Sequence, residues 1–255
     1  MDEITIPVTV LTVSFNAEAT IARTIESVIA QTYDNIEYIV IDGASRDSTA
    51  MIARSYVERF NAVPGRSMRV ISEPDKGMYD ALNKGARMAS GVIVGQINAD
   101  DWYEPDAVKT MAELYEREKY NVGWGTVRLH TGKGKIIKHA KLPKWLWTTM
   151  GWHHTTQFTE KEVLLQHPYV CENTSDEFPG DDWEFLTWCY VNGKKFSVTD
   201  EIITNFSFGG MSTKKSLKDV MKRLKSLYAP YKKYGLSKFY WFHRLCYEML
   251  KYIMA

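Results

Sequence analysis

Two pairs of adjacent aspartates, far apart in the chain, have the residue types that metal and proton chemistry require. Asp100-Asp101 follows Asn98-Ala99 directly after an apolar run, and Asp181-Asp182 follows Gly180. Adjacent carboxylates repel, so keeping both ionised at a buried strand end requires a compensating cation. A divalent ion bridging a carboxylate and a diphosphate would supply that charge, and hard oxygen ligands favour Mg²⁺ or Mn²⁺. The second pair could remove a proton from an incoming hydroxyl, or it could simply lie in the favourable first turn of a helix.

Other polar residues could hold a nucleotide diphosphate. Asp42 ends a second apolar run, where a carboxylate could accept the N3–H of a uracil, although an ordinary strand-to-helix turn also fits. Residues 72–85 form a loop that opens a helix, and Lys76 near that helix N-terminus suits a diphosphate, although an ordinary solvated helix start also fits. Polar side chains about one turn apart share a face of this helix: Asp80, Asn83 and Lys84.

Aromatic and imidazole side chains gather at Trp152-His153-His154. Adjacent residues rarely point the same way, so a metal site made of the two histidines is disfavoured. The segment fits a pocket lining or a structural role.

The elements that must position these residues follow from apolar periodicity. Strands are predicted at 8–14, 36–41, 68–72 and 92–97, and helices at 20–31, around 52–60, at 79–89 and from Pro105 onward. This alternation over about 115 residues predicts a parallel sheet with helices on both faces. Ligands of such sheets bind beyond the carboxyl ends of the strands, where the acidic residues lie. Further on, strands are predicted at 122–130 and 195–199 and a helix at 181–191.

Charge is distributed unevenly along the 255 residues. Residues 211–255 contain 11 Lys and Arg against two acids, whereas residues 1–210 contain 21 against 29, so a boundary is expected near Gly209-Gly210. The basic tail predicts amphipathic helices on an anionic membrane surface; packing on the body or in a dimer is the alternative. No nucleic-acid motif accompanies the charge, so nucleic acid is not an expected partner.

The cysteines and the hydropathy pattern bear on the compartment. Three widely spaced cysteines and the absence of an 18-residue apolar stretch predict a cytoplasmic protein. Through its tail, the chain could be peripheral on the inner face of the cell membrane.

Four segments, in order, carry a family resemblance. They are Thr12-Val-Ser-Phe-Asn-Ala-Glu18, Ile41-Asp-Gly-Ala-Ser-Arg-Asp-Ser-Thr49, Ser72-Glu-Pro-Asp-Lys-Gly-Met-Tyr-Asp-Ala-Leu-Asn-Lys-Gly85 and Asn98-Ala-Asp-Asp101. With them the chain resembles family 2 glycosyltransferases, particularly bacterial members that build surface polysaccharide or lipopolysaccharide. The resemblance runs from about residue 8 to 210. It implies the GT-A fold, a Rossmann-like and mainly parallel twisted sheet with helices on both faces, here followed by a basic helical extension.

The resemblance also implies roles for single residues. Asn16, Glu18 and Asp42 would hold the nucleotide, and the loop residues Lys76, Asp80 and Asn83 would join them in donor binding. Asp100 would coordinate the metal, with Asp101 beside it. Asp182 would be the catalytic base. An acceptor or sugar pocket would contain Trp152, His154 and Asp181.

These roles define an inverting transferase that uses a nucleotide-diphosphate sugar, with UDP favoured, and a glycan or lipid-linked acceptor. Residues 1–115 would bind the nucleotide and residues 116–210 the acceptor. Many relatives have aspartate at the positions of Gly43 and Asn98, which leaves metal affinity and nucleotide identity open. The alternatives are a polyprenol-phosphate sugar synthase, a sugar nucleotidyltransferase and a non-catalytic sugar-binding relative. An NAD-dependent oxidoreductase is disfavoured because no G-x-G-x-x-G follows the first strand.

Overall fold

The computed structural model describes residues 6–143, 151–171, 181–207 and 228–237, together with positions 239, 242, 245, 246 and 249. Of Asp181, only the backbone is described.

Four strands of the N-terminal half form a parallel sheet in the order β3-β2-β1-β4. Their bounds are β1 Val8–Ser14, β2 Ile36–Asp42, β3 Arg66–Ser72 and β4 Ile93–Asn98. The register pairs Ser14 with Asp42 and Val13 with Asn98. The carboxyl ends of β2, β1 and β4 are therefore level, and the residues that follow them share one edge of the sheet.

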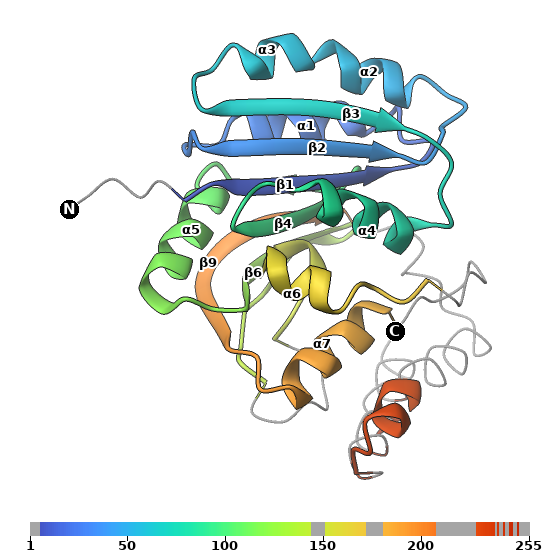
Figure 1. Ribbon diagram of the computed structural model, residues 1–255, viewed down its shortest axis with the longest axis vertical. Coiled ribbons are helices and arrows are strands. Elements are labelled where there is room, and N and C mark those ends of the chain that lie inside the picture. The colour runs from blue at the N-terminus through green and yellow to red at the C-terminus, as the bar shows by residue number, and fades with distance from the viewer. Residues whose placement is uncertain are drawn as a thin grey trace.

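Successive side chains along β1 enter two different cores, because neighbouring residues of a strand point to opposite faces. Val8 and Val10 belong to the first core, and Leu11 and Val13 belong to the second. Helices on the first face are α1 Ile21–Ile29, α2 Thr49–Ser55, α3 Val57–Asn61 and α5 Ala107–Glu118. Helices on the second face are α4 Met78–Met88, α6 Lys161–Gln166 and α7 Asp181–Val191. In Figure 1, α4 crosses in front of the sheet and α1 lies behind it, so the predicted arrangement with helices on both faces is confirmed.

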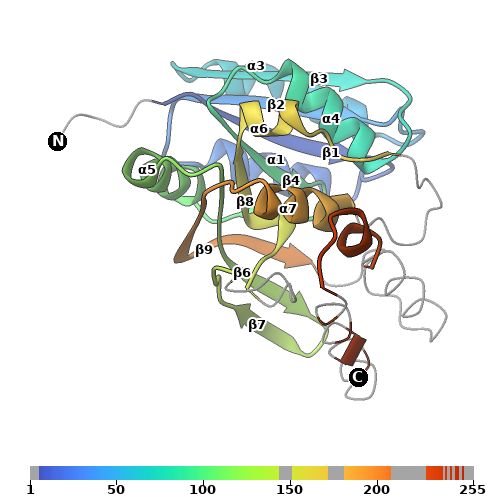
Figure 2. The same ribbon diagram turned by 60° about the horizontal axis from the view of Figure 1, so that its bottom comes forward.

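Beyond β4 the sheet becomes mixed, with the order continuing β4-β8-β6-β9-β5. The added strands are β5 Trp102–Tyr103, β6 Val122–Thr131, β7 Gly134–Lys138, β8 Gln157–Glu160 and β9 Phe196–Ser207. β8 is antiparallel to both β4 and β6, while β9 is parallel to β6. β7 pairs with β6 off the main path, and Figure 2 shows this hairpin at the end of the molecule away from β3.

Several predicted boundaries change in the structure. The single helix expected around residues 52–60 is two short helices, α2 and α3, with Tyr56 between them. Pro105 precedes α5 rather than starting it, because Asp106 is the N-cap. The strand predicted at 195–199 continues to Ser207. The sequence patterns did not predict β5, β7, β8 or α6.

The basic tail is described only in part. The expected boundary at Gly209-Gly210 and most of the expected tail helices lie outside the described residues. Residues 228–233 are helical, and Tyr231 is buried in the second core with its ring centroid 6.4 Å from that of Trp183. This part of the tail packs on the body, while its contact with a membrane stays a prediction. Within the described residues, no helix combines the length and the apolar character needed to cross a bilayer.

Candidate active site

The turn after β4 holds two carboxyl groups that lack sufficient positive charge. Asp101 is fully buried; its carboxylate accepts hydrogen bonds from the Ser207 backbone N–H (2.9 Å) and the Asn98 amide (3.3 Å). Burial, and then the charge of Asp100, raise the pKa of Asp101 to about 8. Burial also raises the pKa of Asp100, and the nearby Arg23 offsets this only in part. A divalent cation would supply the missing charge at this turn.

Arg23 and Ser207 fix this turn, and the sequence analysis identified neither. The Arg23 guanidinium donates to the Asp100 carbonyl (2.7 Å) and to Ser207 Oγ (3.0 Å), and it lies 3.9 Å from the centroid of the Trp102 ring. Ser207 Oγ donates to the same carbonyl at 2.8 Å. Arg23 is on α1, Asp100 is in the β4–β5 turn and Ser207 is at the end of β9, so only the fold brings these three residues together.

A chain of side chains joins this turn to the start of α7. The Asn98 amide nitrogen lies 3.1 Å from Nε2 of His154, and Nδ1 of His154 lies 4.0 Å from Oδ2 of Asp182. His154 lies on a short 3₁₀ helix, His154–Thr156, immediately before β8. Asp182 is 26% exposed, so a ligand can reach its carboxylate. Asp182 is thus linked through His154 and Asn98 to the turn that contains Asp101.

The protonation state of His154 follows from its surroundings. Burial, and then the charge of Lys138, lower the pKa of His154 to about 4, so the ring is neutral at pH 7. An amide nitrogen only donates, so Nε2 of His154 accepts from Asn98 and the single ring proton is on Nδ1. That N–H faces Asp182 across a gap too long for a direct hydrogen bond.

Asp42, the predicted partner of the nucleobase, is fully buried at the end of β2. Its carboxylate accepts from the hydroxyl of Ser14 (3.2 Å) and from both the backbone N–H (3.0 Å) and the hydroxyl of Ser45. It also accepts from the hydroxyl of Ser72 (2.6 Å). A carboxylate has about four acceptor positions, so all of them are occupied here. Asp42 holds the ends of three strands together, and its contact with a base stays a prediction.

Asn16 and Glu18 link the turn after β1 to the turn after β2. Asn16 Oδ1 accepts from the Arg46 backbone N–H at 2.9 Å, and Glu18 Oε2 accepts from that of Ser48 at 2.9 Å. Asn16 has the positive φ of 49° that asparagine tolerates better than most residues. Beside them, Phe15 is 63% exposed at the end of β1, so its ring is available to a ligand.

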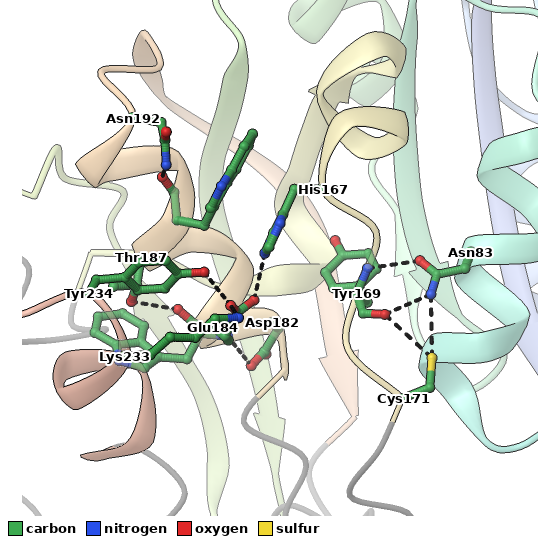
Figure 3. A network of polar contacts seen from close by, with 12 residues as sticks. Asn83, His167, Tyr169, Cys171, Asp182, Glu184, Thr187, Asn192, Lys233 and Tyr234 are labelled. Carbon is green, nitrogen blue, oxygen red and sulfur yellow. Dashed lines mark hydrogen bonds and ion pairs between the residues drawn. The ribbon is translucent and has the colours of Figure 1, made fainter.

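The loop before α4 contains the other predicted donor residues. Lys76 is exposed, and its backbone N–H donates to Asp80 Oδ2 at 3.1 Å. Asn83 is nearly buried: Oδ1 accepts from the Tyr169 backbone N–H (2.9 Å), and Nδ2 donates to the Tyr169 carbonyl (2.8 Å). Figure 3 shows Asn83 reaching from α4 to Tyr169 and Cys171. Asn83 therefore fixes this segment in the structure, and its role with the donor stays a prediction.

The predicted acceptor residues occupy different environments. Trp152 is buried, with its indole N–H donating to Gln157 Oε1 at 2.9 Å, whereas His154 is partly exposed beside Asp182. The side chain of Asp181 lies outside the described part of the chain.

Two residues beyond Asp182, Glu184 anchors the tail to α7. Its carboxylate accepts from His167 Nε2 (2.9 Å), Lys233 Nζ (2.6 Å) and the Tyr234 hydroxyl, as Figure 3 shows. Burial opposes ionisation of Glu184, but these three hydrogen bonds outweigh it and lower its pKa to about 2. The sequence gives no sign of this role of Glu184, because its partners are up to 50 residues away.

The donor set at the turn fits a metal held only partly by protein. In the described ranges, no group of three or more His, Cys, Asp or Glu side chains is placed to hold a metal ion. Asp100, which is partly exposed beside the buried Asp101, offers one carboxylate at the turn where positive charge is lacking. Such a site requires oxygen ligands from a diphosphate and water, the coordination that Mg²⁺ commonly adopts with nucleotides.

Comparisons with known proteins agree with this architecture. A family model described as glycosyl transferase family 2 matches residues 9–171. The chain is 35% identical over 104 residues to EpsH of Bacillus subtilis (strain 168), covering 41% of this chain and 29% of EpsH. It is 30% identical over 105 residues to the chondroitin synthase of Escherichia coli, covering 41% and 15%. It is 24% identical over 215 residues to a PGL/p-HBAD biosynthesis glycosyltransferase of Mycobacterium tuberculosis, and this match covers 83% of this chain and 81% of that protein. The chain thus spans less than a third of the first two relatives.

Solved structures show the same fold. S. aureus TarS 1–349 in complex with UDP-GlcNAc superposes with a TM-score of 0.70 at 17% identity, over 95% of this chain and 71% of that one. The mannosyltransferase PcManGT from Pyrobaculum calidifontis, in complex with GDP-Man and Mn²⁺, superposes with a TM-score of 0.65 at 18% identity. The superposition covers 89% of this chain and 64% of that one. At these identities the likeness concerns the fold, and it confirms the predicted GT-A architecture.

Proposed function

The chain belongs to glycosyl transferase family 2, and from this we propose that it is an inverting, metal-dependent transferase. Its donor would be a nucleotide-diphosphate sugar, with UDP favoured, and its acceptor a glycan or lipid-linked sugar in polysaccharide synthesis. One observation supports the proposal: Asp182 lies 4.0 Å from His154, which contacts Asn98 at the start of the Asp100-Asp101 turn. A single acidic cluster could be structural, but two clusters at one site divide naturally into a metal side and a base side.

In this proposal Asp182 removes the proton from the acceptor hydroxyl as that oxygen attacks the anomeric carbon. One oxygen, Oδ1, accepts from the Trp183 backbone N–H at 2.6 Å, so the carboxylate has a fixed orientation on α7. The Nδ1–H of His154 faces the other oxygen, Oδ2, at 4.0 Å. Attack from the side opposite the leaving diphosphate inverts the configuration.

Asp100 would hold the divalent metal together with oxygens of the diphosphate. When bound, that ion stabilises the negative charge of the departing nucleoside diphosphate. Arg23 and Ser207 hold the Asp100 backbone, so the carboxylate is presented from a fixed turn. Support comes from PcManGT, whose structure contains GDP-Man and Mn²⁺.

The nucleotide would lie over the level ends of β1 and β2. The exposed Phe15 ring could stack on a base, and Asn16 and Glu18 shape the turn beneath it. TarS, which shares this fold, is seen with UDP and with UDP-GlcNAc.

The proposal is tested by thermal shift with a panel of nucleotide sugars, with and without Mn²⁺, followed by assay of nucleoside diphosphate release. A bound donor raises the melting temperature by mass action. We expect one donor to stabilise the protein only with the metal and to be hydrolysed slowly without acceptor. Release of no nucleoside diphosphate from any donor would identify a non-catalytic relative.

A further inference from the structure

The β6–β7 hairpin exposes large apolar side chains at the edge of the sheet. Among the described strands, β7 pairs with β6 alone. Ile136 is 54% exposed and Ile137 is 40% exposed, although neighbouring strand residues point to opposite faces. Leu142, just beyond the hairpin, is 49% exposed. The hairpin therefore presents apolar groups on both of its faces.

The sequence around these apolar groups is rich in basic residues. Residues 120–159 contain six Lys and Arg and no Asp or Glu. Three of the lysines lie on or next to β7: Lys133, Lys135 and Lys138. Lysines alone would be explained as protection of an edge strand against pairing with other chains. That explanation does not cover isoleucines exposed between them, a combination that suits an anionic lipid surface.

An apolar ladder connects this edge to the reaction site. Ile136 pairs across the strands with Leu129, and Leu129 pairs with Phe206 of β9. Directly paired residues stand on the same face of a sheet, so the three side chains form one row. The ring centroid of Phe206 lies 4.6 Å from that of His153 and 6.5 Å from that of His154. The row thus runs from the exposed hairpin to the histidine beside Asp182.

We propose that the β6–β7 hairpin docks on an anionic lipid surface and directs the reaction site toward the lipid part of a lipid-linked acceptor. This inference rests on the proposed function, because it assigns the class of acceptor to the same site. Ile136 and Ile137 enter the headgroup region, and the exposed Lys133 and Lys135 contact lipid phosphates. The apolar ladder connects the docked hairpin to the strand end beside His154.

The test is co-sedimentation of the full chain with vesicles of phosphatidylcholine, with or without phosphatidylglycerol. Two hairpin variants are compared with wild type: Ile136→Ser/Ile137→Ser and Lys133→Glu/Lys135→Glu. Matched controls change exposed residues on other elements: Met51→Ser, at 67% exposure, and Arg54→Glu/Lys109→Glu. We expect both hairpin variants to lose about tenfold or more in partition to anionic vesicles, with controls unchanged and melting temperatures retained.

Equal pelleting of wild type and both hairpin variants on anionic vesicles would overturn the proposal. A change of oligomeric state in the hairpin variants, without vesicle binding by wild type, would overturn it in favour of an interface between protein copies. Release of nucleoside diphosphate, assayed without vesicles, separates this inference from the proposed function. Donor turnover without vesicle binding removes only the docking surface, and vesicle binding without turnover of any donor removes only the enzymatic assignment.

Discussion

Oδ2 of Asp182 lies 4.0 Å from Nδ1 of His154, although the two residues are 28 positions apart in the chain. His154 is also in contact with Asn98 at the end of β4. One imidazole therefore lies between the proposed base and the proposed metal turn.

Replacing Asp182 with asparagine should reduce sugar transfer by about a thousandfold, because the amide cannot accept the proton of the acceptor hydroxyl. Donor binding should stay within about twofold, since the change keeps the size of the side chain. Steady-state kinetics and calorimetric donor titration measure the two quantities. Asp200→Asn, at an exposed position on β9, is the control. Wild-type turnover by Asp182→Asn would exclude this residue as the base.

His154 should remain neutral across the physiological range. The folded-state pKa of about 4 lies below the ordinary value of 6.5, so the ring gains its proton only as the pH falls toward 4. Lys138→Met removes the second cause of the lowered pKa and should move it upward. Nitrogen-15 NMR of the imidazole, assigned with His154→Gln, gives the titration directly. A midpoint near 6.5 in wild type would contradict the assigned tautomer and its role beside Asp182.

Asp100→Ala should weaken donor binding about tenfold or more when Mn²⁺ is present, and little when a chelator removes it. The reason is that the variant loses the one carboxylate assigned to the ion, while contacts to the nucleotide remain. Donor titration under both conditions measures the difference. Glu58→Ala, exposed on α3, controls for loss of a surface acid. Unchanged metal-dependent binding in Asp100→Ala would place the ion elsewhere.

Glu184→Gln should destabilise the fold at pH 7 by on the order of 2 kcal/mol, because hydrogen bonds to a charged carboxylate are stronger than those to a neutral amide. The folded pKa of Glu184 is lowered to about 2, so its contribution is fully present above the ordinary value of 4.5. It is lost as the pH falls from 4.5 toward 2. Melting temperatures at a series of pH values should therefore converge for wild type and variant in acid.

The control for that series is Glu162→Gln, which alters an exposed acid on α6. A wild-type advantage over Glu184→Gln that persisted undiminished near pH 2.5 would rule out the ionised carboxylate as its source.

Sequence patterns were sufficient for the N-terminal sheet, because β1 and β2 are buried on both faces and appear as nearly continuous apolar runs. The positions of Asp100 and Asp182 at element boundaries were also predictable. Short or partly exposed elements gave no such signal: β8 has four residues and β7 is exposed along most of its length.

Partners that are distant in the chain could not be predicted. Asn83 shares a polar helix face with Asp80 and Lys84, which suggested ligand binding. Its side chain instead forms hydrogen bonds with the backbone of Tyr169, 86 residues away. Asp42 lies where a base could bind, yet serines from three separate segments occupy its oxygens. Hydrophobic periodicity predicts on which face of a helix or strand a side chain lies. It does not predict which distant segment packs against that face.

The burial of Tyr231 against Trp183 has a practical consequence. A chain shortened at residue 210 would lose the basic tail and would also expose the aromatic side of α7, leaving Glu184 without Lys233 and Tyr234. Such a truncation would report on a disturbed α7, the helix that carries the proposed base, as much as on the missing charge. Charge reversal at exposed tail lysines such as Lys232 tests the effect of charge alone, because it leaves the contact between the tail and α7 in place.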